Sequence, residues 1–152
     1  MPPSSRRANV IRIDVINRQT ALAIDRHQLR RAVRTVLRGE AVAEAEIELA
    51  VVDDPAIRQL NDRYLHHDEA TDVLSFLLER SATFLEGQVV VSADRAQAVA
   101  PQVGGSPAEE LLLYAIHGTL HLVGYEDDTP RQRSKMQARE RHYLSRLGLD
   151  RH

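Results

Sequence analysis

The stretch "SPAEELLLYAIHGTLHLVG" (residues 106–124) carries the clearest helix signals in the chain and decides its fold. Ser106 is a typical N-cap, Pro107 takes the first helical position, and Glu109 completes a capping box. Residues 111–123 are apolar on almost every side, so this helix is expected to be covered all round. The sequence therefore predicts one central, buried helix on which the other elements pack.

The segments around this helix predict a small sheet and further helices. Alternating or β-branched apolar residues indicate strands near 9–17, 45–53, 71–76 and 87–92. Capping signals indicate the other helices, which begin after Asp25 (ending at Gly39), after Asp54 (burying Ile57, Leu60 and Tyr64), near Ser92, and after Thr129 (ending near Gly148). The order β-α-β-α-β-β-α-α-α predicts an α/β (α+β) fold, a mixed sheet of about four strands flanked by about five helices. We expect a single domain over 9–150 and a disordered N-terminus over 1–8, and the strand order stays open.

Composition narrows the class of protein and the chemistry of any metal site. The chain has 152 residues, of which 43% are hydrophobic, and a net charge of −2. No window approaches the roughly twenty apolar residues of a membrane span, and no secretory signal is visible, so a cytoplasmic protein is expected. Because there are no cysteines, a metal would need histidine, aspartate or glutamate ligands.

His117 and His121 stand four residues apart, so their imidazoles project from one face of the predicted central helix. One helix can supply two zinc ligands in this way, although two hydrogen-bonded core histidines would show the same spacing. Asp127 favours the metal, because Gly124 can end the helix in a left-handed conformation and let the chain return. We predict one Zn²⁺ per chain, held by His117, His121 and Asp127, with a metal-bound water as the catalytic group.

Gly118 lies where metalloproteases with the H-E-x-x-H motif carry their catalytic glutamate. Glycine cannot transfer a proton, so no protein base is assigned and peptide hydrolysis is disfavoured, although Glu126 or Asp128 could serve as its base. We expect the small size of Gly118 to leave room beside the metal. Phosphodiester cleavage is favoured instead, because it can rely more on the metal and on positioned cations.

The segment "HGTLHLVGYED" (117–127) resembles the H-G-x-L-H-L-x-G-Y-D-H signature of the YbeY family, single-domain bacterial endoribonucleases. "LNDRYLHHDEATDVLSF" (60–76) and "GQVVVS" (87–92) are similar to two further family segments, in the same order. The resemblance implies a mixed sheet flanked by helices and a zinc ion in a cleft. It also implies a single-strand endoribonuclease in small-subunit ribosomal RNA maturation and ribosome quality control. The implied partners are ribosomal RNA precursors and the small ribosomal subunit, with ribosomal or assembly proteins as further candidates.

The chain departs from the family pattern at several positions. Asp127 replaces the third histidine, Gln88 an acidic residue and Ala70 a proline. Leu65 stands where the family has an arginine thought to hold the RNA phosphate, and leucine cannot pair with phosphate. The candidate replacements are Arg58, Arg63, His66 and His67.

Candidate substrate-binding residues lie before and within the strand near 71–76, where they could line the metal cleft. They are His66, His67, Thr71, Asp72 and Ser75. Solvated-loop, turn and strand-edge roles explain the same residues. The last helix also carries basic residues that could touch phosphate or form a solvated face, namely Arg131, Arg133, Lys135, Arg139, Arg141 and Arg146.

Three functional hypotheses follow from these residues. The leading one is a metal-dependent endoribonuclease that acts on ribosomal RNA precursors. The second is a non-catalytic ribosome-assembly factor with a structural metal, which the leucine at position 65 motivates. The third is a minimal metallopeptidase, which rests on the histidine spacing alone. The oligomeric state and the RNA sequence that is cut are not readable from the residues.

Overall fold

The computed structural model describes residues 10–65 and 71–149, and their elements follow the predicted order. The strands are β1 (Ile11–Asn17), β2 (Glu44–Val52), β3 (Val73–Arg80) and β4 (Phe84–Ser92). The α-helices are α1 (Arg26–Gly39), α2 (Asp54–Leu65), α3 (Ala93–Val99), α4 (Pro107–Leu122) and α5 (Pro130–Arg146), with a short 3-10 helix, η1 (Ala100–Val103), before α4. The predicted disordered segment 1–8 lies outside the described residues.

The four strands form one mixed sheet in the order β1-β2-β4-β3. β1, β2 and β4 are parallel, whereas β3 pairs antiparallel with β4 and contains a bulge between Leu77 and Glu79. The predicted α+β class is therefore confirmed. The order of the strands, which could not be read from the sequence, is now known. The last two strands are longer than predicted, because their hairpin ends continue the pairing through charged residues.

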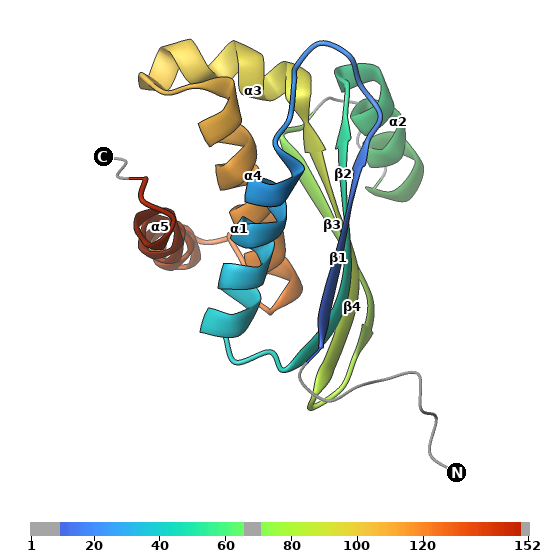
Figure 1. Cartoon of the computed structure of the whole chain (residues 1–152), viewed down its shortest axis with the longest axis vertical. Coiled ribbons are helices and arrows are strands. Elements are labelled where there is room, and N and C mark those ends of the chain that lie inside the picture. Colours follow the sequence, from blue (N-terminus) through green and yellow to red (C-terminus); the bar gives the residue numbers. More distant parts are fainter. Residues whose placement is uncertain (1–9, 66–70, 150–152) are drawn as a thin grey trace.

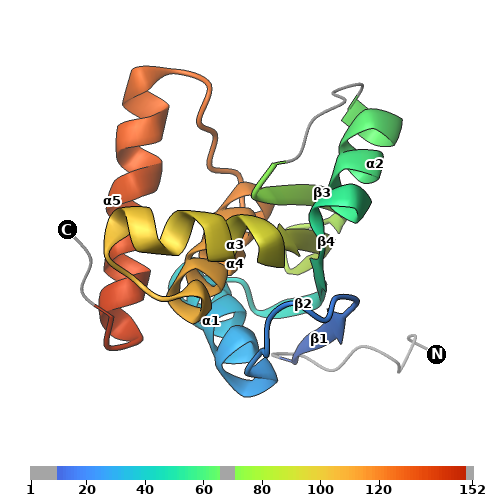
Figure 2. The same cartoon turned by 90° about the horizontal axis from the view of Figure 1, so that it is seen from above.

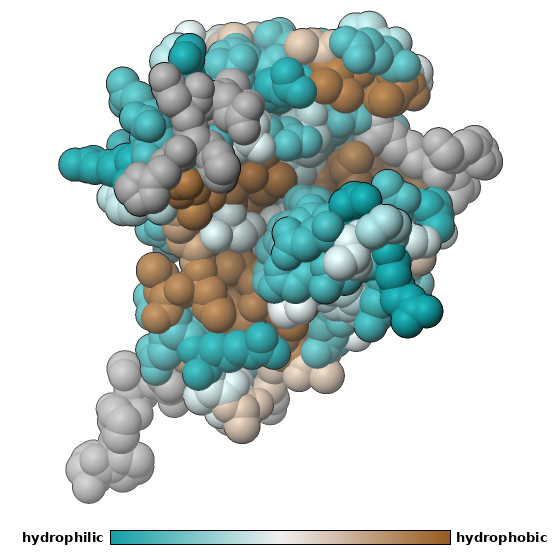
Figure 3. Space-filling view, turned by 180° about the vertical axis from the view of Figure 1, so that it is seen from behind, coloured by the Kyte–Doolittle hydropathy of each residue, from teal (hydrophilic) through white to brown (hydrophobic). Residues whose placement is uncertain are grey.

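Helices cover both faces of the sheet, but unequally (Figures 1 and 2). The larger apolar core joins one face of β1, β2 and β4 to α1, α3, α4 and α5. A smaller core on the other face packs Ala50, Val52 and Val90 against Ile57 of α2. β3 is an edge strand, and Leu77 and Leu78 remain 49% and 57% exposed on it. Figure 3 shows the face behind that of Figure 1, where apolar surface gathers beside hydrophilic side chains.

Helix α4 is the central helix that the sequence predicts. The Ser106 hydroxyl accepts from the main-chain N–H of Glu109, whose carboxylate accepts from the N–H of Ser106, so the capping box is formed. The helix buries residues on nearly every side, including Leu111, Ile116 and Leu120. A second capping box, between Thr129 and Gln132, begins α5 as predicted.

The start of α2 differs from the prediction. Asp53, not Asp54, is the cap, because its carboxylate accepts from the main-chain N–H of Ala56 at 2.9 Å. Asp54 is the first helical residue, and its carboxylate accepts from the Ser92 hydroxyl at 2.8 Å. The prediction that Tyr64 is buried is wrong, since it is 57% exposed in the last turn of α2.

Gly39 ends α1, but not by taking a left-handed conformation. The left-handed residue after this helix is Ala41, with φ 62°. A side chain at Gly39 would overlap the ring of Tyr143, so the glycine allows α5 to approach α1 closely. Among residues 10–65 and 71–149, no helix combines the length and hydropathy that crossing a bilayer requires.

Candidate metal centre

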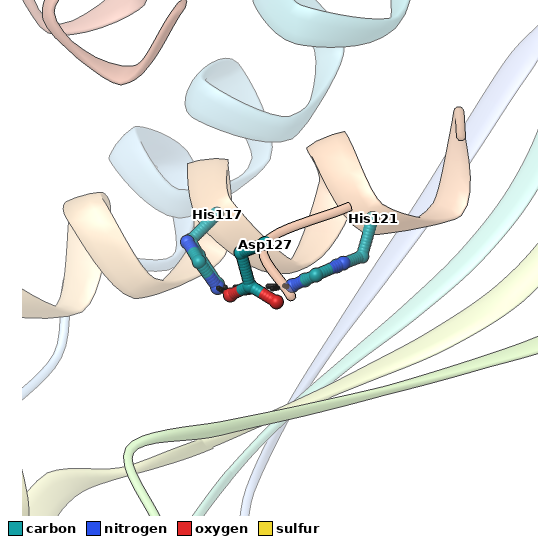
Figure 4. A group of neighbouring side chains, drawn as sticks. All are labelled: His117, His121 and Asp127. Carbon is teal, nitrogen blue, oxygen red and sulfur yellow. Dashed lines mark hydrogen bonds and ion pairs between the residues drawn. The ribbon is translucent and has the colours of Figure 1, made fainter. Parts of the chain in front are cut away.

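His117 and His121 lie on one face of α4, one turn apart, near its C-terminal end. Their side chains are 22% and 25% exposed, so both are partly shielded yet open on one side. The rings lie edge to face, with centroids 4.7 Å apart. Figure 4 shows both rings pointing toward the carboxylate of Asp127, which comes from the chain after the helix.

The return of the chain after α4 depends on Gly124, as predicted. Gly124 has φ 110°, a value that favours glycine, and its N–H donates to the carbonyl of His121. The N–H of Tyr125 then donates to the carbonyl of Leu120, which closes the helix end. This turn brings Asp127 back beside the face that carries the two histidines.

The three side chains converge on one point. The Nε2 atoms of His117 and His121 are 3.1 Å apart, and Asp127 Oδ2 lies 3.4 Å from each of them. Ligand atoms about 2.0–2.2 Å from one tetrahedral ion stand roughly 3.3–3.6 Å apart. The two separations of 3.4 Å lie in this range and the 3.1 Å separation lies just below it, so the arrangement is close to that around a shared ion. Among the described residues, His117, His121 and Asp127 form the group of histidine and carboxylate side chains whose ligand atoms lie close enough together to hold a metal ion.

Glu140 of α5 orients His117. Its carboxylate accepts from His117 Nδ1 at 2.5 Å, and its side chain is 14% exposed. With the proton on Nδ1, the Nε2 atom presents its lone pair toward His121 and Asp127, as a metal ligand requires. Burial lowers the pKa of His117, but the hydrogen bond and charge of Glu140 and the charge of Asp127 raise it above the ordinary 6.5.

Glu40, just after α1, anchors the turn that carries Asp127. Its carboxylate accepts from the hydroxyl of Tyr125 at 2.9 Å, from Arg139 Nη2 at 2.6 Å, and from the hydroxyl of Tyr143. Burial raises the pKa of Glu40, but these three hydrogen bonds lower it below the ordinary 4.5. The network ties α1, α5 and the turn together two residues before Asp127.

Gly118 faces the sheet, so the expectation that it leaves room beside the metal is wrong. A side chain there would overlap Val89 and lie 3.0 Å from Val73 and 3.1 Å from the Ser75 hydroxyl. The Ser75 hydroxyl donates to the carbonyl of Gly118 at 2.8 Å, which holds α4 against β3. At the position of the protease glutamate, α4 therefore packs directly against the sheet and leaves no space for a side chain.

A recess of about 210 Å³ opens beside the three converging side chains. Its walls include Asp72, Tyr114, His117, Asp127, Arg133 and Gln137. Of the predicted substrate-binding residues, Asp72 lines the recess, and Thr71 donates to the Asp72 carboxylate at 3.3 Å. Ser75 supports α4 instead. His66 and His67 lie outside the described residues.

Two residues of this region, Glu140 and Glu40, were not predicted from the sequence, whereas Arg133 was one of the basic residues that could touch phosphate. Of the two roles left open for Arg139, a solvated helix face is excluded, because its guanidinium pairs with Glu40. Gln88, one of the departures noted from sequence, lines a pocket with Glu48 and Glu86. Gln88 precedes Val89 in β4, and Val89 faces α4. Because consecutive residues of a strand point to opposite faces of the sheet, Gln88 points away from the metal centre.

Known proteins with similar sequences belong to one family. The family described as "Endoribonuclease YbeY" matches residues 14–148. A protein named Endoribonuclease YbeY from Desulforamulus reducens is 37% identical over 149 residues, covering 90% of this chain and 97% of the relative. Its counterpart from Chloroherpeton thalassium is 34% identical and covers 88% of this chain and 94% of the relative.

A solved structure supports the fold independently. The solution structure of TM1509 from Thermotoga maritima aligns with a TM-score of 0.59 and 21% sequence identity. The alignment covers 90% of this chain and 91% of that protein. The same arrangement of sheet and helices therefore occurs in a protein of distant sequence.

Proposed function

The chain belongs to the YbeY family of endoribonucleases, and on that premise we propose that it is a zinc-dependent hydrolase that cleaves single-stranded RNA. Its substrates are ribosomal RNA precursors of the small subunit, and its place is the cytoplasm, in ribosome maturation and quality control. The observation that carries the proposal is the convergence of His117, His121 and Asp127 beside an open recess.

The side chains fit a zinc ion in number, type and spacing. Two imidazoles and one carboxylate leave a fourth tetrahedral position, which is the pattern of a catalytic site. When bound, a divalent ion supplies a Lewis acid that lowers the pKa of a water and polarises a phosphoryl oxygen. Asp127 adds a negative charge where the family has a neutral histidine, which weakens that Lewis acid and admits harder ions.

The residues around the centre position these ligands and the substrate. Glu140 keeps His117 in one tautomer, and Glu40 holds Tyr125 and so the turn that carries Asp127. Asp72 offers the recess a carboxylate outside the triad, and we assign it to accepting a hydrogen bond from a ribose hydroxyl or a base amino group of the substrate rather than to contacting a phosphate. No protein base is assigned.

Zinc stoichiometry and RNA cleavage test the proposal together. Purified wild-type protein is expected to bind one zinc ion per chain and to cut a labelled single-stranded ribosomal precursor fragment. Asp127→Ala is expected to lose both properties, whereas Asp128→Ala, which removes the neighbouring carboxylate, keeps them. Equal cleavage by wild type and Asp127→Ala would rule out this centre as the source of the activity.

A non-catalytic assembly factor is the second candidate, because one observation favours it. Leu65, at the position of the family's arginine, is 46% exposed and offers no charge for a phosphate, so the cation in the last turn of α2 is Arg63. In that case chelation would lower the melting temperature, while metal-replete protein would bind the small subunit without any cleavage. The metallopeptidase hypothesis loses support, because the contact of Gly118 with Val89 leaves no space for a glutamate.

A further inference from the structure

The recess beside the metal centre contains one arginine or lysine among the described residues that line it, which is Arg133 of α5. Besides the neutral Tyr114 phenol, the ionisable groups around it are His117 and three carboxylates, Asp72, Asp127 and Glu140. An RNA strand brings a negative phosphate at every nucleotide, and such carboxylates repel it. Besides the proposed zinc ion, a cationic side chain in this recess is therefore needed to offset these carboxylates when a phosphate binds.

Arg133 is held in place by the turn that carries the third ligand. Its Nη1 donates to the main-chain carbonyls of Asp127 and Asp128, both at 3.3 Å. A guanidinium has five N–H donors in a rigid plane, so Nε and Nη2 keep donors for a phosphate while Nη1 holds the turn. The cation is thus fixed relative to Asp127 rather than placed at the end of a loose side chain.

The nearby charges make this cation effective for a phosphate. Glu140 is paired with His117, and Asp127 belongs to the candidate ligand set, so both carboxylates have partners in the zinc-loaded protein. Leu65 contributes no charge from α2. We propose that Arg133 binds a phosphate of the RNA chain next to the scissile bond and seats that strand in the recess, a role that rests on the proposed function.

A structural role for Arg133 makes different predictions and can be separated from substrate binding. Glutamine at this position keeps an N–H donor on a side chain two bonds shorter and removes the positive charge. Arg131 is exposed on the same helix and does not line the recess, so Arg131→Gln is the matched control. Both variants lose one charge from α5, and only one of them changes the recess.

The test measures binding of zinc-loaded protein to a fluorescein-labelled single-stranded RNA at several salt concentrations. Arg133→Gln should bind about ten-fold more weakly, with a salt slope smaller by about 0.7–1, because one phosphate contact is lost. In cleavage assays KM should rise more than kcat falls. Zinc affinity and melting temperature should match wild type, and Arg131→Gln should bind RNA as wild type does.

Two results would overturn the proposal. One is RNA binding and a salt slope for Arg133→Gln that match Arg131→Gln. The other is a loss of zinc affinity that parallels the loss of RNA binding, since Arg133 would then only hold the turn. A wild type that binds the RNA without cutting it would contradict the proposed function, and the binding comparison between the two variants would still decide the role of Arg133.

Discussion

Replacing Glu140 with glutamine tests whether α5 prepares His117 to bind a metal. The carboxylate contacts His117 Nδ1 at 2.5 Å, and the two side chains are only 14% and 22% exposed, so solvent screens the pair weakly. A hydrogen bond to a charged group contributes about 1.5–3 kcal/mol and a neutral one about 0.5–1.5 kcal/mol. The difference of about 1–1.5 kcal/mol corresponds to roughly a ten-fold change in an equilibrium constant.

A second effect adds to this loss. The glutamine amide can donate to Nδ1, which would place the imidazole proton on Nε2, where the metal must bind. We therefore expect Glu140→Gln to weaken zinc binding by about 10- to 100-fold. Glu46→Gln makes the same chemical change at an exposed position of β2 and should leave zinc affinity unchanged.

Zinc affinity is measured by competition with a chromophoric chelator near neutral pH. The zinc-free proteins add a pH test, because the pKa of His117 lies above 6.5 in the folded state. The protonated pair with Glu140 stabilises the fold fully below the ordinary pKa, and this stabilisation is lost as pH rises through the raised value. Wild type should therefore exceed Glu140→Gln in melting temperature most at about pH 5.5 and least at about pH 9. A zinc affinity within about two-fold of wild type would refute the reasoning.

Three further predictions address the elements that support the centre. Gly118→Ala should lower the free energy of unfolding by roughly 1 kcal/mol, because the overlap of the new methyl group with buried Val89 outweighs the better helix propensity of alanine. A variant that is more stable than wild type in urea melts would contradict this. Glu40→Gln should lose about 1.5–3 kcal/mol of stability at neutral pH. Because the pKa of Glu40 is lowered, this loss should vanish as pH falls below 4.5 through that pKa, and a pH-independent loss would count against the network. Asp127→His should raise the ratio of Zn²⁺ to Mn²⁺ affinity roughly ten-fold in competition titrations, and an unchanged ratio would show that residue 127 is not a ligand.

The parts of the fold that could be predicted are those with local signals. The capping boxes before α4 and α5 each lie within four residues, and the apolar pattern of α4 is continuous. The glycine at position 124 is equally local, because a positive φ such as its 110° favours a residue without a side chain. The proximity of Asp127 to the two histidines could therefore be inferred without knowing the strand order.

The support of the centre could not be predicted, because it depends on distant pairings. His117 and Glu140 are 23 residues apart, and Glu40 and Tyr143 are 103 apart, so no local pattern connects them. The direction of Gly118 depends on how α4 is rotated against the sheet, which its motif does not reveal. The sequence does not distinguish Arg133 from the other arginines of α5, because its position beside the recess depends on how the turn after α4 packs against α5.

X-ray diffraction at the zinc absorption edge, on crystals of the metal-replete protein, can show directly whether His117, His121 and Asp127 hold a metal. We expect one ion bound by Nε2 of His117, Nε2 of His121 and a carboxylate oxygen of Asp127, with at least one position open to a non-protein ligand. An anomalous peak elsewhere, no peak at these residues, or a fourth protein ligand that closes the site would contradict this expectation.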